Sequence, residues 1–409
     1  MLTFLEARQL VLDHLTPLTP CRKPLDQVLG LAVAEDLHAF EAVPPFTNSA
    51  MDGFALRAAD AATATDLSPV RLRVTGDLAA GAVPKGAVEP GTALRIMTGA
   101  PLPEGADAVV PQEHTQHGPG WVELRRPLKI GANVRRAGED LPKGGLVVTV
   151  GTALRAGEIA VLASTGFAEV PVYPRAKVAV LTTGDELVEC GLLPGPGQIR
   201  DANIHALCAQ IRAMGAVPVP FPRIPDQRGH VEAALIEALA TCDLVLTTGG
   251  VSVGDFDFVK PVLESLGAEQ VFWRVAQKPG GPLGFWRLKG KPVFGIPGNP
   301  VAAMLMMEEY VRPACRKLMG FRQLHRPERQ GILDQPWRKS SPDGRVHFLR
   351  VRVQESNGEW HTVLTGPQGS GILSSMLHAN ALAVIQESED AIPAEGQVLL
   401  HLTEWSEDH

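Results

Sequence analysis

The second half of the chain alternates short β-branched runs with helically spaced apolar residues. Residues 177–182 (K-V-A-V-L-T) contain a short apolar run that predicts a buried strand, and the apolar positions after Asp201 recur at helical spacing as far as Met214. Further strands are predicted at 217–221, 244–248 and near Val271 and Val293, with helices at 226–240 and 258–266. This alternation predicts a three-layer α/β domain built on a parallel sheet.

Short strands without intervening helices are predicted on both sides of this segment. Before residue 177 they fall at 70–74, 92–97, 106–112, 121–124 and 145–150, separated by Gly/Pro turns. After residue 320 they fall at 331–333, 346–354, 360–364, 381–387 and 398–402. The pattern therefore predicts one or two β-rich domains first and a small C-terminal β-barrel last.

Composition and charge narrow the class of protein. The 409 residues are enough for two or three domains, and 45% hydrophobic against 20% charged residues exclude a disordered chain. The net charge of −7 argues against a nucleic-acid partner, and no apolar stretch approaches the roughly 20 residues of a membrane span. Five scattered cysteines without a C-x-x-C pair, and a capping box at Thr3 and Glu6 in place of a signal peptide, favour a reduced, cytoplasmic protein.

Three strand ends of the predicted sheet carry unusual loops. They are 182–186 (T-T-G-D-E), 247–257 (T-T-G-G-V-S-V-G-D-F-D) and 295–300 (G-I-P-G-N-P). Ligands of open α/β sheets bind beyond the carboxyl ends of strands, so we expect the three loops to meet at one crevice. Their glycine amides suit a phosphate group, with Asn299 and Pro300 opening the next helix.

The same loops carry acidic residues that would repel a phosphate. A hard divalent cation, most simply Mg²⁺, placed between these carboxylates and the phosphate would remove the repulsion. The carboxylates are those of Asp185, Glu186, Asp255 and Asp257. Lys278, in a further loop, adds a positive charge. The alternative is that the glycines only make turns and the acids are solvated. Ordinary P-loop, dinucleotide and serine-hydrolase motifs are absent from the sequence, and His114 and His117 are interpreted as surface residues.

The loops and three upstream motifs together resemble one family. The motifs are 182–187 (T-T-G-D-E-L), 249–257 (G-G-V-S-V-G-D-F-D), 297–301 (P-G-N-P-V), 48–55 (N-S-A-M-D-G-F-A), 95–103 (R-I-M-T-G-A-P-L-P) and 133–140 (N-V-R-R-A-G-E-D). They are similar to signatures of the molybdopterin molybdenumtransferases, which include MoeA and the E domain of gephyrin. The resemblance covers nearly the whole chain.

This resemblance implies an elongated homodimer of four-domain subunits. The implied domains are a split platform at 1–41 and 141–172, an inserted β-rich domain at 42–140, the α/β molybdopterin-binding domain at 173–320 and the barrel at 321–409. It also implies that adenylyl-molybdopterin is bound, that its phosphoanhydride is cleaved with release of AMP, and that molybdate is inserted into the dithiolene. Transient contacts with other proteins of cofactor biosynthesis are implied as well.

The resemblance further assigns roles to individual residues. The implied catalytic residues are Asp52, Thr98, Glu186, Asp257 and Lys278, with Glu186 and Asp257 as Mg²⁺ ligands and Asp52 and Thr98 reaching the α/β site of the other subunit. The implied substrate-binding residues are Gly184, Asp185, Asp226, Gly249, Gly250, Ser252, Gly254, Pro297, Gly298, Asn299, Pro300 and Asp140. Lys278, Arg350 and Ser370 are implied to bind molybdate.

The sequence departs from the family pattern at three positions. Gly281 stands where many members have a second Lys, Ala302 where a Ser follows P-G-N-P-V, and Phe54 where Tyr is frequent. These differences leave two alternatives open: a preference of the protein for tungstate over molybdate, and a paralogue with weaker activity. Two other functions also remain as alternatives: a molybdopterin adenylyltransferase and a non-catalytic molybdopterin-binding scaffold.

Overall fold

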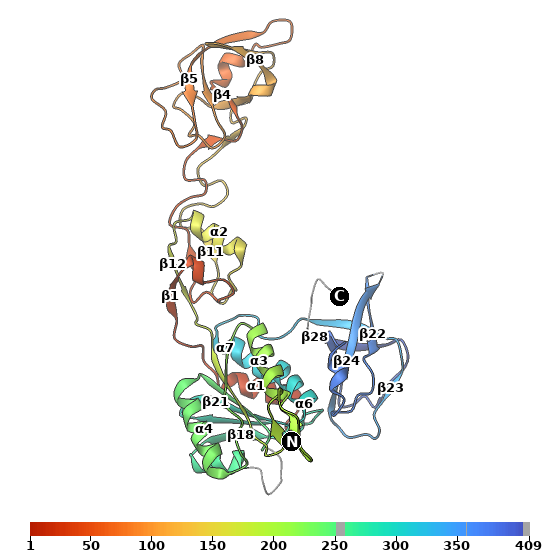
Figure 1. The fold of residues 1–409 in the computed structure, drawn as a ribbon. Coiled ribbons are helices and arrows are strands. Elements are labelled where there is room, and N and C mark those ends of the chain that lie inside the picture. Colours follow the sequence, from red (N-terminus) through yellow and green to blue (C-terminus); the bar gives the residue numbers. More distant parts are fainter. Residues whose placement is uncertain (251–257, 357, 404–409) are drawn as a thin grey trace.

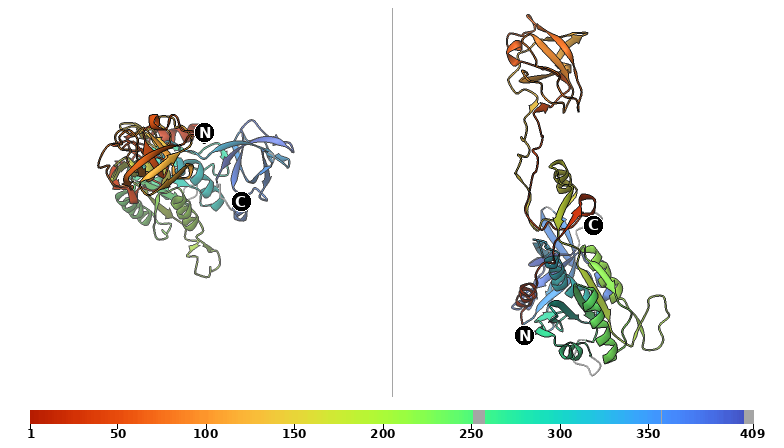
Figure 2. Two further views of the ribbon diagram at one scale, coloured as in Figure 1. Left: turned by 90° about the horizontal axis from the view of Figure 1, so that it is seen from above. Right: turned by 90° about the vertical axis from the view of Figure 1, so that its left-hand side faces the viewer.

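The elongated molecule has four units, three of which follow one another along its length, while the C-terminal barrel lies beside the lowest of them (Figure 1). The computed structural model describes residues 1–250, 258–356 and 358–403. Two extended segments connect a β-rich unit, here called the distal domain, to the rest of the chain, and the right-hand view of Figure 2 shows the same separation. The distal domain therefore lies far from the α/β sheet of its own chain.

The distal domain is built on a six-stranded sheet in the order β7-β4-β6-β5-β9-β8. Its elements are β3 (Asn48–Ser49), β4 (Gly53–Leu56), η2 (Ala58–Ala61), β5 (Val70–Leu78), β6 (Thr92–Ile96), β7 (Ala108–Pro111), η3 (Gln112–His114), β8 (Thr115–Gly118), β9 (Trp121–Leu124) and β10 (Val134–Arg135). Apolar side chains that alternate with polar ones along the strands, such as Leu72, Val122 and Leu124, form its core together with Phe54. β3 pairs with β10 where the two connecting segments enter the domain.

A small middle unit joins the connecting segments to the main body. Its elements are β1 (Cys21–Pro24), η1 (Leu25–Gln27), β2 (Leu37–His38), β11 (Leu146–Val148), α2 (Ala156–Ser164) and β12 (Glu169–Val172). β1 pairs with β12 and β2 with β11, both antiparallel, so the chain before and after the distal domain is held side by side. Val28, Leu154, Leu162 and Val170 form its core.

The main body contains a six-stranded sheet in the order β16-β13-β17-β21-β20-β18. Its strands are β13 (Lys177–Thr182), β16 (Val217–Pro220), β17 (Leu244–Thr248), β18 (Glu269–Trp273), β20 (Gly284–Leu288) and β21 (Lys291–Ile296), and the short strands β14 (Leu187–Val188), β15 (Ile199–Arg200) and β19 (Gln277–Lys278) lie outside the sheet. The helical segments are α1 (Phe4–Asp13), α3 (Asn203–Ala213), α4 (Arg228–Thr241), α5 (Val259–Ser265), α6 (Pro300–Met306), η4 (Met307–Val311) and α7 (Arg312–Leu318). No helix in the described ranges is both long and apolar enough to cross a bilayer.

Each face of this sheet has its own apolar core. One core includes Phe4 of α1, Leu207 of α3 and Met306 of α6, and the other includes Leu235 of α4 and Val262 of α5. Helices therefore cover both faces, which confirms the predicted three-layer α/β class.

The expectation of a parallel sheet is wrong at one edge. β20 runs antiparallel to both β21 and β18. Lys289 and Gly290, with φ of 52° and 79°, connect β20 to β21, and two residues of positive φ make the tight turn that suits a hairpin. Because a connection this short leaves no room for a crossover helix, the strand pair must be antiparallel.

The C-terminal segment closes into the predicted barrel. Strands β24, β25, β22, β28 and β26 pair in that order, and β26 pairs back with β24. The elements are β22 (Glu328–Leu333), β23 (Trp337–Arg338), β24 (Val346–Ser356), β25 (Glu359–Leu364), η5 (Leu373–Met376), β26 (Ala381–Ile385), β27 (Ala391–Ile392) and β28 (Gly396–Leu402).

A buried ionic group joins the barrel to the main body. The Glu309 carboxylate lies 3.4 Å from Nη1 of Arg8 on α1 and 2.9 Å from Nδ1 of His401 on β28. All three residues are buried. Since moving the barrel would break the buried hydrogen bond between His401 and Glu309 and leave polar atoms without a partner, this contact opposes movement of the barrel against the body.

Candidate functional site

The three loops singled out by the sequence lie next to one another. They follow β13, β17 and β21, which are adjacent parallel strands, so all three loops begin at the carboxyl-terminal ends of neighbouring strands. Asn203 Nδ2 donates hydrogen bonds to Thr248 Oγ1 (2.9 Å) and to the Gly298 carbonyl (2.8 Å), and Thr248 Oγ1 donates to the Pro297 carbonyl (3.0 Å). The second and third loops are therefore fixed against each other.

The ends of these loops are shaped as the residue types suggest. Asn299 is the N-cap of α6, where its Oδ1 accepts a hydrogen bond from the Val301 amide (3.2 Å), and Pro300 takes the first helical position.

Residues 251–257, which include Ser252, Gly254 and Asp257, lie outside the described residues. Their predicted roles in substrate and metal binding stay predictions.

Gly249 allows the first two loops to approach closely. Its φ is +86°, and a Cβ at this position would lie 2.6 Å from the Thr183 carbonyl oxygen. Backbone atoms cannot move aside as a flexible side chain can. The sequence therefore needs glycine here for the loops to meet.

Replacing Gly249 by alanine is expected to destabilise the α/β domain by at least about 1–3 kcal/mol, because the strained φ adds to the clash. Thermal unfolding followed by circular dichroism measures the change. Gly298→Ala is the matched control, since its Cβ would come no closer than 3.6 Å to Gly249 Cα. Equal melting temperatures of the two variants would contradict the close approach.

Two buried polar atoms at this loop cluster have no partner. Thr183 Oγ1 and Asn203 Oδ1 form no hydrogen bond among the described residues, although both residues are buried. An unsatisfied buried polar atom costs about 1–3 kcal/mol, so both favour a bound molecule that supplies a partner. This is a physical indication of a ligand site that residue types alone do not give.

Acidic residues lie at the outer rim of the first loop. The Asp185 and Asp226 carboxylates each accept a hydrogen bond from the other residue's amide (3.3 Å), and Arg223 Nη1 lies 4.0 Å from Asp185 Oδ1. The Glu186 carboxylate folds back over Gly184, where it would be 2.5 Å from an added Cβ. Among the described residues, no three His, Cys, Asp or Glu side chains are arranged as a metal site. The Mg²⁺ ligands Glu186 and Asp257 stay a prediction.

A cavity of about 560 Å³ opens between the α/β domain and the barrel. Lys278, Asn299 and Pro297 line it from the α/β side, and Ser370 lines it from the barrel side. Gly281 and Ala302, the two departures from the family pattern that concern the oxyanion, also lie in its wall. The structure thus brings Lys278 and Ser370 to one cavity together with the third loop.

Buried polar contacts hold the Lys278 loop. Gln277 is fully buried, its Nε2 donates to the Pro279 carbonyl (3.2 Å), and the Tyr310 hydroxyl donates to its Oε1. Burial raises the pKa of Tyr310 well above its usual value, so this hydroxyl keeps its proton and remains a donor. The backbone on both sides of Lys278 is therefore fixed while its side chain is exposed.

Arg350 lies behind the cavity wall. Its guanidinium donates to Ser375 Oγ (3.0 Å) and to the carbonyls of Gln368 (3.1 Å) and Gly369 (3.0 Å), and the side chain is fully buried. Burial lowers its pKa to about 10, which leaves it charged at neutral pH. Arg350 thus holds the loop that presents Ser370, and its predicted contact with the oxyanion stays a prediction.

Asp52 and Thr98 meet in the distal domain. The Thr98 amide and hydroxyl both donate to Asp52 Oδ1 at 2.7 Å, and these two hydrogen bonds lower the pKa of the carboxyl. Both side chains are exposed. The distal domain that carries them lies far from the α/β sheet of its own chain (Figures 1 and 2). Asp140 is also exposed, near the connecting segments, where its amide donates to the Val43 carbonyl.

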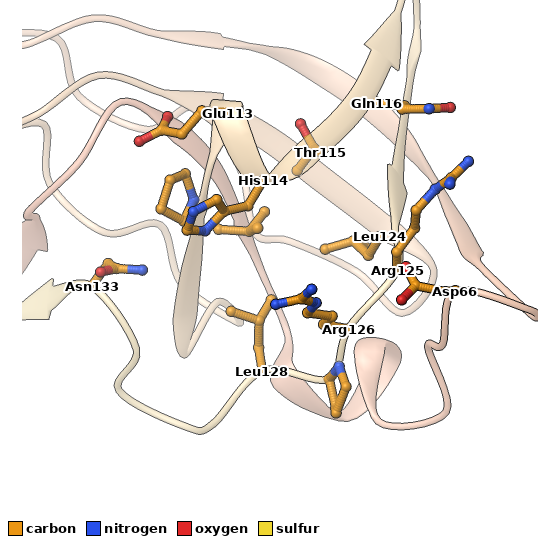
Figure 3. A pocket seen from close by; sticks show the side chains of 13 residues that line it. Asp66, Glu113, His114, Thr115, Gln116, Leu124, Arg125, Arg126, Leu128 and Asn133 are labelled. Atoms are coloured by element: carbon orange, nitrogen blue, oxygen red, sulfur yellow. The ribbon is translucent and has the colours of Figure 1, made fainter.

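The distal domain has a cavity of its own, of about 520 Å³ (Figure 3). His114 and Glu113 lie on one side of it and Arg125, Arg126 and Asp66 on another. It mixes both signs of charge, and Asn133, the first residue of the 133–140 motif, also lies in its wall. None of the residues to which the resemblance assigns a role lines this cavity.

The chain matches three family models in sequence order. They are described as the MoeA N-terminal region (domain I and II) at residues 2–166, a probable molybdopterin binding domain at 179–317 and the MoeA C-terminal region (domain IV) at 332–400. Two proteins called molybdopterin molybdenumtransferase are similar along most of their length. The second such enzyme of Mycobacterium tuberculosis is 37% identical over 96% of this chain and 97% of its own, and that of Bacillus subtilis is 37% identical over 88% and 84%.

A solved structure is similar over the whole chain. The molybdopterin biosynthesis MoeA protein from Pyrococcus horikosii matches with a TM-score of 0.86 and 31% identity, over 99% of this chain and 100% of its own. The agreement therefore includes the arrangement of the four units as well as their individual folds.

Proposed function

The chain belongs to the molybdopterin molybdenumtransferase family, and on this premise we propose that it inserts molybdenum into molybdopterin during molybdenum cofactor biosynthesis. One observation carries the proposal to this chain's own residues. A single cavity joins the third glycine loop, through Pro297 and Asn299, to the exposed cation Lys278 and to Ser370. A phosphorylated pterin and an oxyanion can therefore be held next to each other.

The substrate we propose is adenylyl-molybdopterin, which carries a diphosphate. The backbone amide of Gly298 would receive the diphosphate, and the unpartnered Thr183 hydroxyl would donate to one of its oxygens. The Gly184 and Gly249 amides already donate to the Ile224 and Ile296 carbonyls (3.4 and 3.3 Å), so these two glycines shape the loops. The exposed carboxylates of Asp185 and Glu186 offer oxygen donors of the kind that Mg²⁺ prefers. Glu186 would hold the ion with Asp257, and a bound Mg²⁺ would neutralise charge on the phosphates and favour release of AMP.

The oxyanion would bind at the other end of the cavity. The Lys278 side chain makes no ion pair or hydrogen bond within the described part of the chain, so its full charge is available to molybdate. Ser370 would donate from the loop that Arg350 holds. We further propose a homodimer in which Asp52 and Thr98 of a second copy complete the site.

Purified protein supplied with adenylyl-molybdopterin, Mg²⁺ and molybdate tests this function. We expect AMP release and formation of molybdenum cofactor to rise together and to stop when EDTA removes the metal. Consumption of ATP with free molybdopterin would identify an adenylyltransferase, and binding without either product would identify a scaffold.

The Gly281→Lys variant probes the oxyanion end. An added Cβ would lie 3.5 Å from the Gln277 carbonyl and 3.6 Å from that of Val275, which are ordinary contacts, so the backbone accepts a side chain. The new cation is expected to strengthen molybdate affinity by about 0.5–2 kcal/mol, and salt should reduce the gain.

Titration of molybdate at two ionic strengths measures the effect. Gly281→Gln is the control for added bulk without charge. If the Lys and Gln variants bind molybdate equally, the wall at position 281 does not face the anion.

A further inference from the structure

The cavity beside Lys278 is strongly basic in an acidic protein. Its wall carries Lys278, Arg338 and Arg345 together with His347, and none of its described lining residues is Asp or Glu. The chain as a whole has a net charge of −7. A cavity of one sign inside a surface of the other sign concentrates an oppositely charged ligand, here an anion.

Three of these basic residues belong to the barrel. Arg338 lies on β23, Arg345 directly precedes β24, and His347 is the second residue of β24. Arg338 is exposed and forms no ion pair or side-chain hydrogen bond within the described residues. Like Lys278, it is a cation whose charge no neighbouring carboxylate neutralises.

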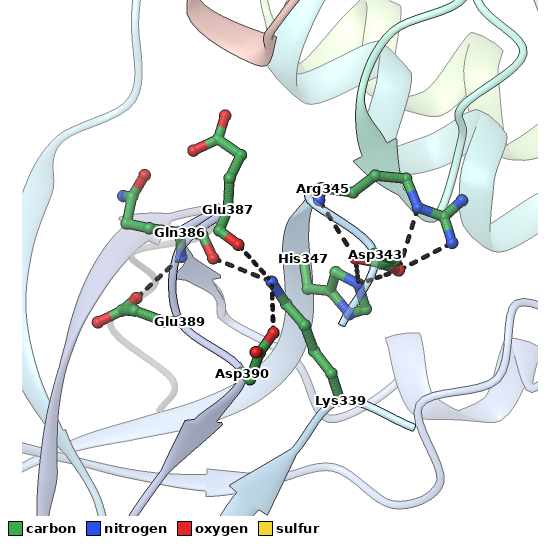
Figure 4. A network of polar contacts seen from close by, with 8 residues as sticks. All are labelled: Lys339, Asp343, Arg345, His347, Gln386, Glu387, Glu389 and Asp390. Atoms are coloured by element: carbon green, nitrogen blue, oxygen red, sulfur yellow. Dashed lines mark hydrogen bonds and ion pairs between the residues drawn. The ribbon is translucent and has the colours of Figure 1, made fainter. Parts of the chain in front are cut away.

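Asp343 fixes the other two residues from behind the wall (Figure 4). Its Oδ2 accepts from Arg345 Nη2 (2.8 Å) and Nε (3.1 Å) and from His347 Nε2 (3.0 Å). Burial opposes ionisation of Asp343, but these hydrogen bonds outweigh it and lower its pKa to about 2. Arg345 is thus held by one edge of its guanidinium, while its Nη1 makes no hydrogen bond among the described residues.

A backbone ladder sets the distance between the two sides. β19 pairs with β24 in parallel, and Lys278 is the register partner of His347. Register partners of a parallel pair point to the same side of the sheet, so both side chains face the cavity. The Trp337 ring packs edge-on against the His347 ring, with centroids 5.4 Å apart.

We propose that Arg338, Arg345 and His347 form the second side of an oxyanion receptor, which holds a tetrahedral anion between the barrel and Lys278. This inference deepens the proposed function and rests on it for the nature of the anion, which is molybdate or a phosphate group of the pterin substrate. Lys278 and Arg338 are unpaired cations on opposite walls, and the Arg345 guanidinium has one edge free. Together they offer donors to the several oxygens of such an anion.

Proton uptake accompanies binding at this receptor. Burial is the main cause that holds the pKa of His347 below its usual value, against the hydrogen bond to Asp343, so the ring is neutral at pH 7 in the free protein. The charged groups around it are Asp343 and Arg345 on its own segment, Arg338 and Lys339 on and beside β23, Asp390 paired with Lys339, and Lys278 on β19. An entering dianion offsets the repulsion from these cations and favours the imidazolium. Because the complex then binds more protons than the free protein, affinity rises as pH falls, by at most about tenfold per pH unit.

Isothermal titration of the full-length protein with molybdate, and separately with inorganic phosphate, tests the receptor. Arg338→Gln and Arg345→Gln are each expected to weaken binding about tenfold, and Arg345→Lys less than Arg345→Gln. Arg352→Gln, exposed on the same strand but outside the cavity, is the control and should bind as wild type. Tighter binding of molybdate or of phosphate distinguishes the two sources of the anion.

The outcomes separate this inference from the proposed function. If both Arg→Gln variants bind as wild type while Lys278→Gln loses binding, the barrel side is not a receptor but the oxyanion site stands. If the wild type binds neither anion, both the receptor and the proposed oxyanion site are overturned.

Proton uptake has its own measurement. Titrations in two buffers of different ionisation enthalpy should show uptake of part of a proton by wild type near pH 7, and none by His347→Gln. Because His347 is buried and its replacement can disturb folding, an NMR titration of the wild-type ring with and without molybdate provides an independent measurement. An equal pKa in the two states would overturn the coupling.

Discussion

Lys278→Gln is expected to lower the rate of molybdenum insertion by roughly 10²–10³-fold, the usual effect of removing one charge-stabilising group from an enzyme site. The Lys278 side chain is exposed in the cavity and makes no hydrogen bond or ion pair among the described residues, whereas its backbone is fixed by the pairing with β24 and through Gln277 and Tyr310. The variant should therefore keep its fold and lose only the charge. Cofactor formation at saturating and limiting molybdate measures the loss.

Lys289→Gln is the matched control for this variant. Lys289 lies in the hairpin turn before β21, at the opposite edge of the sheet from the three loops. The Lys289→Gln substitution should leave both turnover and melting temperature unchanged. Near-normal turnover of Lys278→Gln would remove Lys278 from the mechanism, and a large fall in its melting temperature would make it a structural residue.

Restoration of activity in mixed dimers is the second large effect we expect. The Asp52→Ala and Lys278→Gln proteins should each be inactive. If each site combines the distal domain of one copy with the α/β domain of the other, a heterodimer has one site with both wild-type residues and one with neither. Purified heterodimers should then recover about half of the wild-type activity.

Two affinity tags, one on each variant, allow the heterodimer to be isolated and its composition verified. Heterodimers of Asp52→Ala with Thr98→Ala serve as the control, since both changes fall on the same distal domain surface and neither site is restored. Absence of recovery in the Asp52/Lys278 heterodimer would show that the two residues do not act in one shared site.

Local patterns predicted most of the fold. The strand of residues 177–182, the helix after Asp201 and the barrel strands follow from apolar spacing within each segment, and the structure places elements there. The convergence of three loops was also predictable, since parallel neighbours end at one edge of a sheet. The glycine at 249 and the Asn299 cap were visible because each residue type has a distinct backbone role.

Pairings between distant segments were not predictable in this way. β19 has only two residues, and nothing in Gln277 and Lys278 indicates that they join the barrel strand β24. β20 was missed because its run of apolar residues is short and its Gly/Pro-rich approach predicts a loop. Both depend on which surfaces the tertiary fold brings together.

The basic side of the cavity was missed for the same reason. Arg338, Arg345 and His347 are ordinary polar residues of a turn-rich segment until the barrel closes and presents them to Lys278. Arg350 is the opposite case, since the resemblance implied a contact with molybdate. The sequence does not indicate that its guanidinium donates instead to the Gln368 and Gly369 carbonyls. In both cases burial and direction, rather than residue type, decide the role.

The slender connection between the distal domain and the body has a hydrodynamic consequence. A molecule extended in this way (Figure 1) has a larger Stokes radius and frictional ratio than a sphere of 43.7 kDa. Gel filtration calibrated with globular standards should therefore overstate its mass and make even a single copy elute near the position of a dimer. Light scattering or sedimentation equilibrium, which do not depend on shape, should give the true number of subunits.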